Sequence, residues 1–335
     1  MSKSYTSLIT VFIPVYNGSH YLPETIESLK RQTYTNFEVL LIDDHSTDQS
    51  LEVLKAQTLA DTRFRIMQTP SNLGNAARVI KYGFEFVTGD YFVYSSQDDL
   101  FSADWLESMH ARAIETGAEA TIPDLVFYNP SAPSKERALI GLNGDKDIVL
   151  SGRDAFLNSL DWTIPGNALW KTNLLRKIGW FDFGMNADEY SVREFYLNCE
   201  RVVFSQGVFF YRQNNPEAIT KKMSVQTFDL PYTDLRLWRT AIKHDIDLET
   251  QAKLLNRSIS TLMYFTTIAY KARFRPAIPK IKYTFEQLKS SNAKAWLKEN
   301  HNKDLRSKLN YIALQSFSLF LSISFLKAAI RRLKS

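Results

Sequence analysis

The chain has few residues of the kinds that build cross-linked or extended proteins. Cys199 is the one cysteine among 335 residues, so the sequence excludes the internal disulfide framework that small secreted proteins use. Glycine and proline number 12 and 11, and 44% of the residues are hydrophobic, which excludes collagen-like repeats and wholesale disorder. The composition indicates one large globular domain or two, and a lone cysteine suits a reducing, cytoplasmic compartment.

Several familiar motifs and segments are also missing. The sequence contains no Gly-x-Gly-x-x-Gly, no Gly-x-x-x-x-Gly-Lys and no His-Glu-x-x-His, so neither common phosphate loop nor the zinc protease motif is supported. Residues 1–6 lack the apolar stretch and cleavage site of a signal peptide, and we expect no export. The most apolar run, 311–326, is shorter than the roughly 20 residues of a spanning helix and contains Gln315 and four serines. It predicts a packed or interfacial helix.

Positive charge is concentrated at one end of the chain. Residues 231–335 hold 20 Lys and Arg against 7 Asp and Glu, a balance of +13, whereas residues 1–230 have a balance of −8. Such asymmetry predicts a polyanionic partner or surface. No nucleic-acid-reading motif accompanies the basic part, so we expect an anionic membrane surface and no nucleic acid. Packing on the rest of the chain, or a contact between copies in a homo-oligomer, is the alternative.

Short apolar, β-branched runs alternate with helical spacing through the first half of the chain. Nearly continuous apolar runs predict strands buried on both faces, and their alternation with helices predicts a parallel α/β sheet. From about residue 231 strand patterns stop and helical spacing takes over. The four predicted strands are 8–13, 37–42, 64–67 and 91–94.

Polar residues come directly after three of these strands. They are Pro14 to Asn17, Asp43 to Ser46, and Ser95 to Asp99. Ligands of open α/β sheets collect beyond the carboxyl ends of the strands, so these loops are the candidate site. Adjacent acids there indicate a hard cation such as Mg²⁺ or Mn²⁺, which prefers carboxylate oxygens, and Asp98 with Asp99 suits that role.

The same loops carry a family resemblance. The text from Ile13 through Asp48, with Asn72-Leu73-Gly74, Gly89-Asp90-Tyr91 and Ser95 to Asp99, resembles the opening of family 2 glycosyltransferases over roughly residues 8–110. A second block, Ile178 to Asp182 and Asn186 to Arg193, is similar to the acidic acceptor-side motif of that family. The text from Gly207 to Thr220 resembles the segment after this motif in bacterial capsule and O-antigen transferases.

The resemblance implies a GT-A fold, which is a Rossmann-like, mostly parallel central sheet with flanking helices, here with a C-terminal helical extension. We therefore expect a catalytic domain over 1–230, with a donor half at 1–120 and an acceptor half at 121–230, and a basic helical region at 231–335. The implied activity is inverting, metal-dependent transfer of a sugar from a nucleotide-sugar donor by single displacement. The implied acceptor is a growing surface polysaccharide or a lipid-linked glycan, which places the protein on the inner face of the cell membrane.

Several residues are implied to hold the nucleotide sugar. Asp44 can accept the imide N–H of uracil or thymine, which favours a UDP- or dTDP-sugar. The alternative for Asp44 is an Asx-type turn or a helix cap, with Asp43, Ser46 or Asp48 capping the following helix, and the alternative for His45 is a turn residue. Ordinary turn and helix-surface positions are also the alternative for Asn72, Gly74 and Arg78. The full expected set is Pro14, Val15, Tyr16, Asn17, Asp44, Asn72, Gly74, Arg78, Gln97 and Asp98.

The expected metal ligands are Asp98 and Asp99, although Ser96 stands where the family pattern often has its first aspartate. That departure keeps a second hypothesis open, in which the chain is a non-catalytic nucleotide-sugar-binding subunit of a glycan assembly complex. For the general base, the resemblance implies Asp188, with Glu189 as the rival. The alternative for both is an acidic helix start that stabilises the helix dipole.

Five further residues are expected to contact the diphosphate or the acceptor. Arg212 and Lys221 are candidates for the diphosphate, because positive groups stabilise charge on the leaving group; the alternative is a solvated loop. Trp162, Asn167 and Trp170 are candidates for acceptor contacts, and a buried core position is the alternative for a tryptophan.

Overall fold

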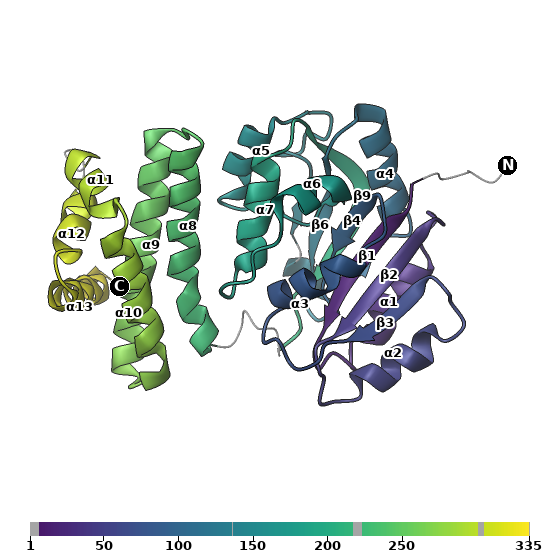
Figure 1. Cartoon of the computed structure of the whole chain (residues 1–335), viewed down its shortest axis with the longest axis horizontal. Helices are drawn as coiled ribbons and strands as arrows, with labels where there is room; N and C mark the ends of the chain where they lie inside the picture. The colour runs from purple at the N-terminus through teal and green to yellow at the C-terminus, as the bar shows by residue number, and fades with distance from the viewer. Residues whose placement is uncertain (1–6, 136, 217–222, 301–304, 335) are drawn as a thin grey trace. The chain divides into compact units, whose positions relative to one another are not determined.

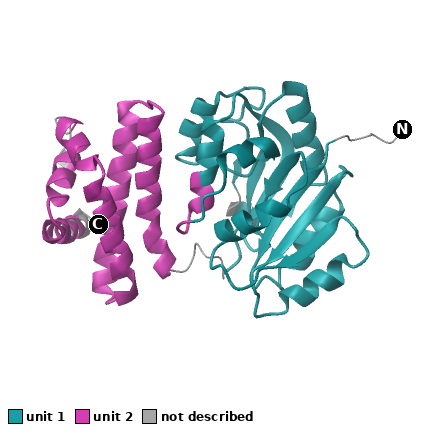
Figure 2. Ribbon diagram, viewed as in Figure 1, with its two compact units in different colours: residues 1–182, 191–218 teal, residues 183–190, 219–335 magenta. Residues whose placement is uncertain are grey.

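The computed structural model describes residues 7–135, 137–216, 223–300 and 305–334 (Figure 1). The chain divides into two compact units, residues 1–182 with 191–218 and residues 183–190 with 219–335 (Figure 2). The predicted boundary at residue 230 separates a catalytic domain from a basic helical region. It is a division by function, and it stays a prediction.

The first unit is built on a nine-stranded sheet of order β3-β2-β1-β4-β8-β6-β9-β5, with β7 paired to β6. The pairings of β1 with β2, β1 with β4, β2 with β3 and β6 with β9 are long and parallel, and four short antiparallel pairings complete the sheet. The strands are β1 Ile9–Val15, β2 Phe37–Asp43, β3 Phe64–Gln68, β4 Tyr91–Tyr94, β5 Leu100–Phe101, β6 Ala120–Tyr128, β7 Ala138–Leu139, β8 Leu169–Lys171 and β9 Val202–Arg212.

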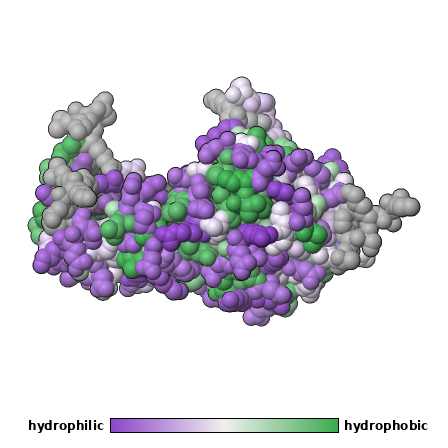
Figure 3. Space-filling model, turned by 90° about the horizontal axis from the view of Figure 1, so that it is seen from above, coloured by the Kyte–Doolittle hydropathy of each residue, from purple (hydrophilic) through white to green (hydrophobic). Residues whose placement is uncertain are grey.

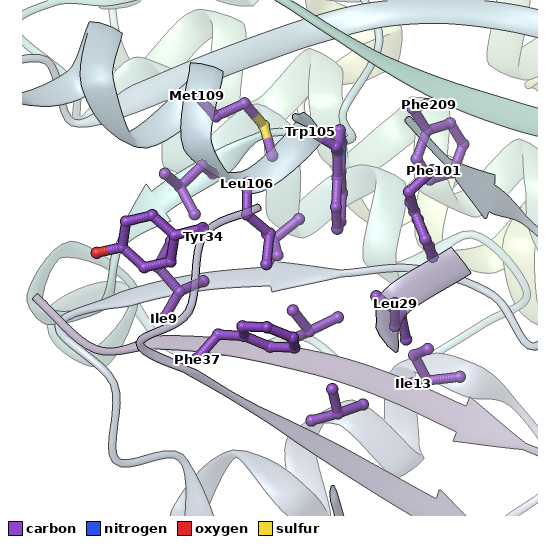
Figure 4. Close-up of a cluster of buried hydrophobic side chains, with 14 of the residues drawn as sticks. Ile9, Ile13, Leu29, Tyr34, Phe37, Phe101, Trp105, Leu106, Met109 and Phe209 are labelled. Carbon is purple, nitrogen blue, oxygen red and sulfur yellow. The ribbon is translucent and has the colours of Figure 1, made fainter. Parts of the chain in front are cut away.

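Helices cover both faces of this sheet. The odd-numbered residues of β1, such as Ile13, lie in one core cluster with Leu29 of α1 and Trp105 of α4 (Figure 4). On the other face, Phe12 lies so close to Gly83 of α3 that a Cβ there would come within 2.5 Å of its ring. The helices are α1 Leu22–Lys30, α2 Ser50–Thr58, α3 Ala76–Gly83, α4 Trp105–Thr116, α5 Gly152–Ser159, α6 Thr172–Ile178 and α7 Ala187–Leu197.

Local sequence explains where these helices start and stop. Asn75 caps α3 by accepting a hydrogen bond from the Arg78 backbone N–H, and Ser151 caps α5 in the same way. Gly117 ends α4 in the left-handed conformation, with a φ of 69°, which a residue with a Cβ adopts only at a cost. The connections after β1, β2 and β4 are short, and they begin at the carboxyl ends of parallel strands, which places their polar residues at one edge of the sheet.

The second unit is helical, as the spacing after residue 231 predicts. Its helices bury Trp238 and Phe285, and Asn310 of α12 donates a 2.6 Å hydrogen bond to buried Asn256 of α9. They are α8 Leu230–Lys243, α9 Leu248–Lys271, α10 Ile278–Ser290, α11 Ala293–Asn300, α12 Leu305–Ala313 and α13 Phe317–Lys334.

The apolar run at 311–326 forms two helices. α12 ends at Ala313 and α13 begins at Phe317, so the run is interrupted at the Gln315 position. Phe320 is buried, whereas Leu326 is exposed. Among the residues described, no helix combines the length and the hydropathy that crossing a bilayer requires. On the face shown in Figure 3, hydrophobic residues gather in separate patches among hydrophilic ones.

Candidate nucleotide-sugar site

The loops after β1 and β2 are bonded to each other. Asn17, in the left-handed conformation with a φ of 49°, accepts a 2.8 Å hydrogen bond from the Thr47 backbone through its Oδ1. The Asn17 backbone donates to Ser46 Oγ at 3.0 Å, and the Gly18 backbone donates to Ser50 Oγ at 2.8 Å. Asparagine tolerates this conformation better than most residues, which gives Asn17 a structural reason to stand here. The loops after β1 and β2 are therefore joined by hydrogen bonds, and the residues at the end of β1, 14–17, form part of one rim at this edge of the sheet.

Gln97 ties the loop after β4 to the same rim. Its side-chain amide bonds the Tyr16 backbone twice, with Oε1 accepting from the N–H at 2.8 Å and Nε2 donating to the carbonyl at 2.9 Å. A Cβ on Gly18 would come within 2.4 Å of this amide, so the glycine leaves room for it. The Tyr16 ring is exposed beside the rim, and Val15 is buried in β1 with Pro14 half-buried next to it. The predicted loop residues 14–17 and Gln97 thus meet in space.

Asp44 is engaged with the loop after β3. Its carboxylate accepts hydrogen bonds from Thr69 Oγ1 at 3.0 Å, the Leu73 N–H at 2.8 Å and the Gly74 N–H at 3.3 Å. Asn72 donates to the Asp44 carbonyl at 2.9 Å. Asp44, Asn72 and Gly74 are therefore brought together as the sequence predicts. In this structure the Asp44 carboxylate accepts its hydrogen bonds from the loop after β3 itself.

Asp43 has the less satisfied carboxylate of the pair. Its Oδ2 accepts from Gln68 Nε2 at 2.8 Å and from the Ser46 N–H at 3.3 Å, which is the turn predicted as its alternative role. Its Oδ1 is buried and has no hydrogen-bond partner among the described residues. A buried carboxylate oxygen without a donor is costly, so a ligand N–H would stabilise it.

Arg78 lies on the surface at the start of α3. It donates to the carbonyl oxygens of Leu73, at 3.2 Å, and Asp182, at 3.3 Å. Its guanidinium therefore supports the loop that contains Asn72 and Gly74. A direct contact of Arg78 with a phosphate stays a prediction.

The two acids after β4 have different surroundings. Asp99 accepts hydrogen bonds from the backbones of Arg212, at 3.1 Å, and Ser96, at 3.2 Å, so both oxygens are used inside the protein. Its burial, reinforced by the neighbouring charge of Asp98, raises the pKa of Asp99 to about 8. Asp98 uses only Oδ2, which accepts from Asn215 Nδ2 at 2.7 Å. Within the described part of the chain, Oδ1 of Asp98 has no hydrogen bond, so Asp98 is the better metal ligand of the two.

Arg212 is a supporting residue, and its burial contradicts the solvated loop that was its alternative interpretation. It ends β9 with its side chain almost completely buried. Nε donates to the Asp98 carbonyl at 2.6 Å, an ion pair joins the guanidinium to Glu24, and the rings of Tyr21 and Tyr128 lie 5.0 and 5.4 Å from it. With these partners the guanidinium holds the loop that carries Asp98. A direct diphosphate contact stays a prediction.

The candidate bases lie on α7. Asp188 and Glu189 occupy its first turn and are half-buried, in the segment 183–190 that belongs to the second unit. Their position at a helix start is also what the alternative interpretation predicts.

The acceptor candidates and the second diphosphate candidate, Lys221, separate into three cases. Trp170 was wrongly predicted to contact the acceptor: its ring is 0% exposed and lies against Phe195 and Tyr196, so it offers no face to a sugar. Trp162 is 39% exposed and has a φ of 63°, an uncommon conformation for a bulky residue, and Asn167 is half-buried in the same loop. Lys221 lies outside the described residues.

Sequence reasoning missed the residues that support this site. Tyr21 directly precedes α1, and Glu24 lies in its first turn. Both look like ordinary helix-start residues, so no sequence signal connects them with β9. Asn215 lies in the text that resembles the family, two residues after Gln213, but only the structure shows its bond to Asp98.

The donor set fits a divalent cation held partly by its ligand. The described residues contain no group of three or more His, Cys, Asp or Glu side chains arranged to hold a metal. Mg²⁺ commonly takes one or two carboxylates and completes its coordination with substrate phosphates and water. Asp98, with one oxygen unused in the described structure, suits that mode of binding and would not suit a cage made of protein alone.

The matching family model is that of glycosyl transferase family 2, and it covers residues 10–181, just over half of the 335 residues. The chain belongs to this family and is a nucleotide-sugar-dependent glycosyltransferase, which confirms the resemblance and the enzyme class. It is 27% identical over 218 residues to glycosyltransferase GlyG of Streptococcus pneumoniae, an alignment that covers 63% of this chain and 72% of GlyG. A similar match to GlyA of the same organism is 27% identical over 214 residues and covers 61% of this chain but only 30% of GlyA.

Solved structures confirm the fold. The structure of S. aureus TarS 1–349 in complex with UDP-GlcNAc matches with a TM-score of 0.65 and 17% identity, over 92% of this chain and 90% of that one. The mannosyltransferase PcManGT from Pyrobaculum calidifontis, in complex with GDP-Man and Mn²⁺, matches with a TM-score of 0.54 and 15% identity, over 98% of this chain and 88% of that one. The mostly parallel α/β architecture with a C-terminal helical region is therefore GT-A, as predicted.

Proposed function

We propose that the protein is an inverting, metal-dependent glycosyltransferase that uses a UDP- or dTDP-sugar. The observation that carries this proposal is the contrast between the two acids after β4. Both carboxylate oxygens of Asp99 accept hydrogen bonds that hold the loop. Asp98 is held by Asn215 and Arg212, and its Oδ1 has no hydrogen bond in the described structure. A cation held by Asp98 would neutralise charge on the nucleoside diphosphate as it leaves.

The remaining roles belong to residues of the chain itself. The rim formed by residues 14–17 and Gln97 would receive the nucleoside, and an aspartate of β2 or the loop after it would accept an N–H of the base. Asp44 remains the proposed acceptor of that bond, and the unpartnered Oδ1 of Asp43 makes Asp43 a second candidate. UDP-GlcNAc in the TarS structure and GDP-Man in the PcManGT structure indicate that the fold accommodates more than one nucleotide.

The proposed transfer is a single displacement. The acceptor hydroxyl oxygen forms a bond to the anomeric carbon while the bond from that carbon to the diphosphate oxygen breaks, which inverts the configuration. The hydroxyl proton passes to Asp188, or to Glu189 as the rival, and the electron pair of the broken bond stays on the diphosphate. The proposed acceptor is a growing surface polysaccharide or a lipid-linked glycan.

A thermal-shift panel tests the donor site. UDP, dTDP, GDP and CMP are each added with and without Mn²⁺ or Mg²⁺ to the wild type and to Asp98→Ala. A ligand that binds only the folded state at 100 times its Kd stabilises it by about 2.7 kcal/mol. We expect one uridine or thymidine nucleotide to raise the Tm of the wild type only with metal, and the variant to lose this gain. An equal shift in Asp98→Ala, or no shift with any nucleotide, would contradict the proposal.

We also propose that the basic helical region binds an anionic membrane surface. Its charge of +13 supports this, as do exposed apolar residues of α13 such as Leu326 and Ile330. A pocket of about 450 Å³ between α9, α12 and α13 has Lys271, Arg306 and Lys327 in its wall and no carboxylate among its lining residues.

Flotation with vesicles measures this association. The wild type is expected to float with phosphatidylglycerol vesicles and not with phosphatidylcholine vesicles, and Lys271→Glu to float less. Lys55→Glu, which reverses an exposed charge on α2, is the matched control. Equal binding to both vesicle types would contradict an electrostatic membrane contact.

A further inference from the structure

Three aromatic side chains of the second unit form a partly exposed cluster. Phe183, Tyr232 of α8 and Tyr283 of α10 have ring centroids 5.3 to 5.8 Å apart. Phe183 is 43% exposed and Tyr283 is 44% exposed. Exposed apolar surface of this kind, rimmed by polar groups, marks binding sites more often than chance placement. We call these three residues the aromatic triad.

The triad is continuous with the segment that carries the candidate base. Phe183 begins the segment 183–190, and Asp188 lies five residues further on. The far end of the segment is fixed on α8, where the Tyr190 hydroxyl lies 3.0 Å from Thr240 Oγ1 and the Arg236 guanidinium lies 3.8 Å from the Tyr190 ring centroid. The segment is therefore held by α8 at both ends, through Tyr232 at one and Thr240 with Arg236 at the other.

A glycine and an ion pair fix the turn within this segment. Gly184 has a φ of 94°, and a Cβ there would lie 3.2 Å from the Asp229 side chain, so the chain passes close to the start of α8. Asp229 itself forms an ion pair with Lys280 of α10. The orientation of Phe183 is thus set by packing and not by a free loop.

The chemistry of the triad suits a sugar. One face of a pyranose ring carries mainly C–H bonds and packs on an aromatic ring, while its hydroxyls need hydrogen-bonding partners at the edge. The tyrosine hydroxyls supply such partners, and the positive charges of Arg239 and Arg236 lie near Tyr283. A purely apolar partner would leave these polar groups unpaired, which disfavours it.

We propose that the aromatic triad is an acceptor subsite that stacks a pyranose ring of the glycan. This inference rests on the proposed role of Asp188 as the base, because a shared segment would then carry both the base and part of the acceptor platform. The C-terminal helical unit accordingly takes part in reading the acceptor, in addition to any contact with a membrane. The triad replaces the buried Trp170 as the aromatic surface for a sugar.

Saturation-transfer NMR on the full chain tests the subsite without a known acceptor. The probes are the methyl glycosides of glucose, galactose, N-acetylglucosamine and mannose, each at a concentration on the order of 10 mM. We expect saturation of the ring C–H protons of at least one probe, and a loss of affinity of roughly 2- to 10-fold in Phe183→Ala and in Tyr283→Ala. Tyr264→Ala, which removes another exposed tyrosine of the same unit, is the control and should bind like the wild type.

The outcomes separate this inference from the proposed function. No saturation in the wild type, or equal saturation in the wild type and both triad variants, overturns the subsite. So does dissociation of a dimer in the triad variants by size-exclusion chromatography, because the triad would then be a contact between copies. Nucleotide binding in the thermal-shift panel tests the proposed function separately, and its failure leaves the sugar-binding result standing on its own.

Discussion

The substitution Asp99→Asn tests whether the second acid of the loop after β4 is protonated in the folded protein. Burial first, and the neighbouring Asp98 charge second, raise the pKa of Asp99 to about 8 from an ordinary value of 3.8. The folded state therefore holds a proton at neutral pH that the unfolded chain has released. Stability that depends on this group is fully present below pH 4 and is lost as the pH rises toward 8.

The expected magnitude comes from linkage. Each pH unit between the unfolded and the folded pKa lowers the free energy of unfolding by about 1.4 kcal/mol, or roughly 4 kcal/mol between pH 4 and pH 7. An asparagine side chain does not titrate, so the variant loses this slope. Its amide adds a donor that faces the Ser96 N–H and costs about 1–3 kcal/mol. At pH 7 the net expectation is a variant that is as stable as the wild type or more stable.

Urea unfolding between pH 5 and pH 8, with a chelator present, measures the slope. Asp61→Asn is the matched control: its hydrogen bond to Arg63 lowers the pKa of Asp61, so removing that carboxylate shifts stability almost equally across this range. Asp98→Asn is expected to reduce the slope in part, because it removes one cause of the raised pKa. Parallel slopes for the wild type and Asp99→Asn would refute the reasoning.

Three further predictions concern Gly18, Arg212 and the candidate base. Gly18→Ala should displace the Gln97 amide, cost about 1–2 kcal/mol for its two lost hydrogen bonds and weaken nucleotide binding measured by calorimetry; unchanged binding would contradict the rim. Arg212→Lys should lower the free energy of unfolding by about 2–3 kcal/mol, mainly through the lost bond to the Asp98 carbonyl, and weaken Mn²⁺-dependent nucleotide binding more than metal-free binding. Asp188→Asn should abolish sugar transfer, measured by nucleoside diphosphate release, with nucleotide binding intact, and Glu189→Gln should retain transfer; the reverse ranking would exchange their roles.

The strands and the order of elements in the first half could be predicted because local pattern determines them. Continuous apolar runs such as 37–42 have one stable environment, the centre of a parallel sheet, and β2 is buried along its whole length. The same pattern places the polar strand ends together at one edge. Long-range pairings were harder: nothing in residues 169–171 indicates an antiparallel strand between β4 and β6, because three residues carry too little periodicity.

The candidate site was predictable to the extent that it lies at strand ends. Tyr16 and Gln97 meet because the loops that carry them are short, and Asp98 and Asp99 directly follow Gln97 in the same loop. Residues whose role depends on distant partners could not be placed, since sequence carries no signal for a bond between positions as far apart as Arg212 and Glu24. Trp170 was wrongly given a role in the site for a related reason. A tryptophan that stacks on a sugar and a tryptophan that fills a core cannot be told apart by their sequence neighbours.

Arg212 shows how charge is arranged beside the two acids of the loop after β4. A free guanidinium beside two carboxylates would neutralise them and compete with a cation for Asp98. Here it donates to the carbonyl of Asp98 and forms its ion pair with Glu24, so these bonds leave the Asp98 carboxylate oxygens to other partners. Meanwhile Asp99, with a raised pKa, adds less negative charge than an ionised acid would. The loop is thus held by hydrogen bonds that leave Oδ1 of Asp98, the oxygen that we propose binds the metal, without a bond in the described structure.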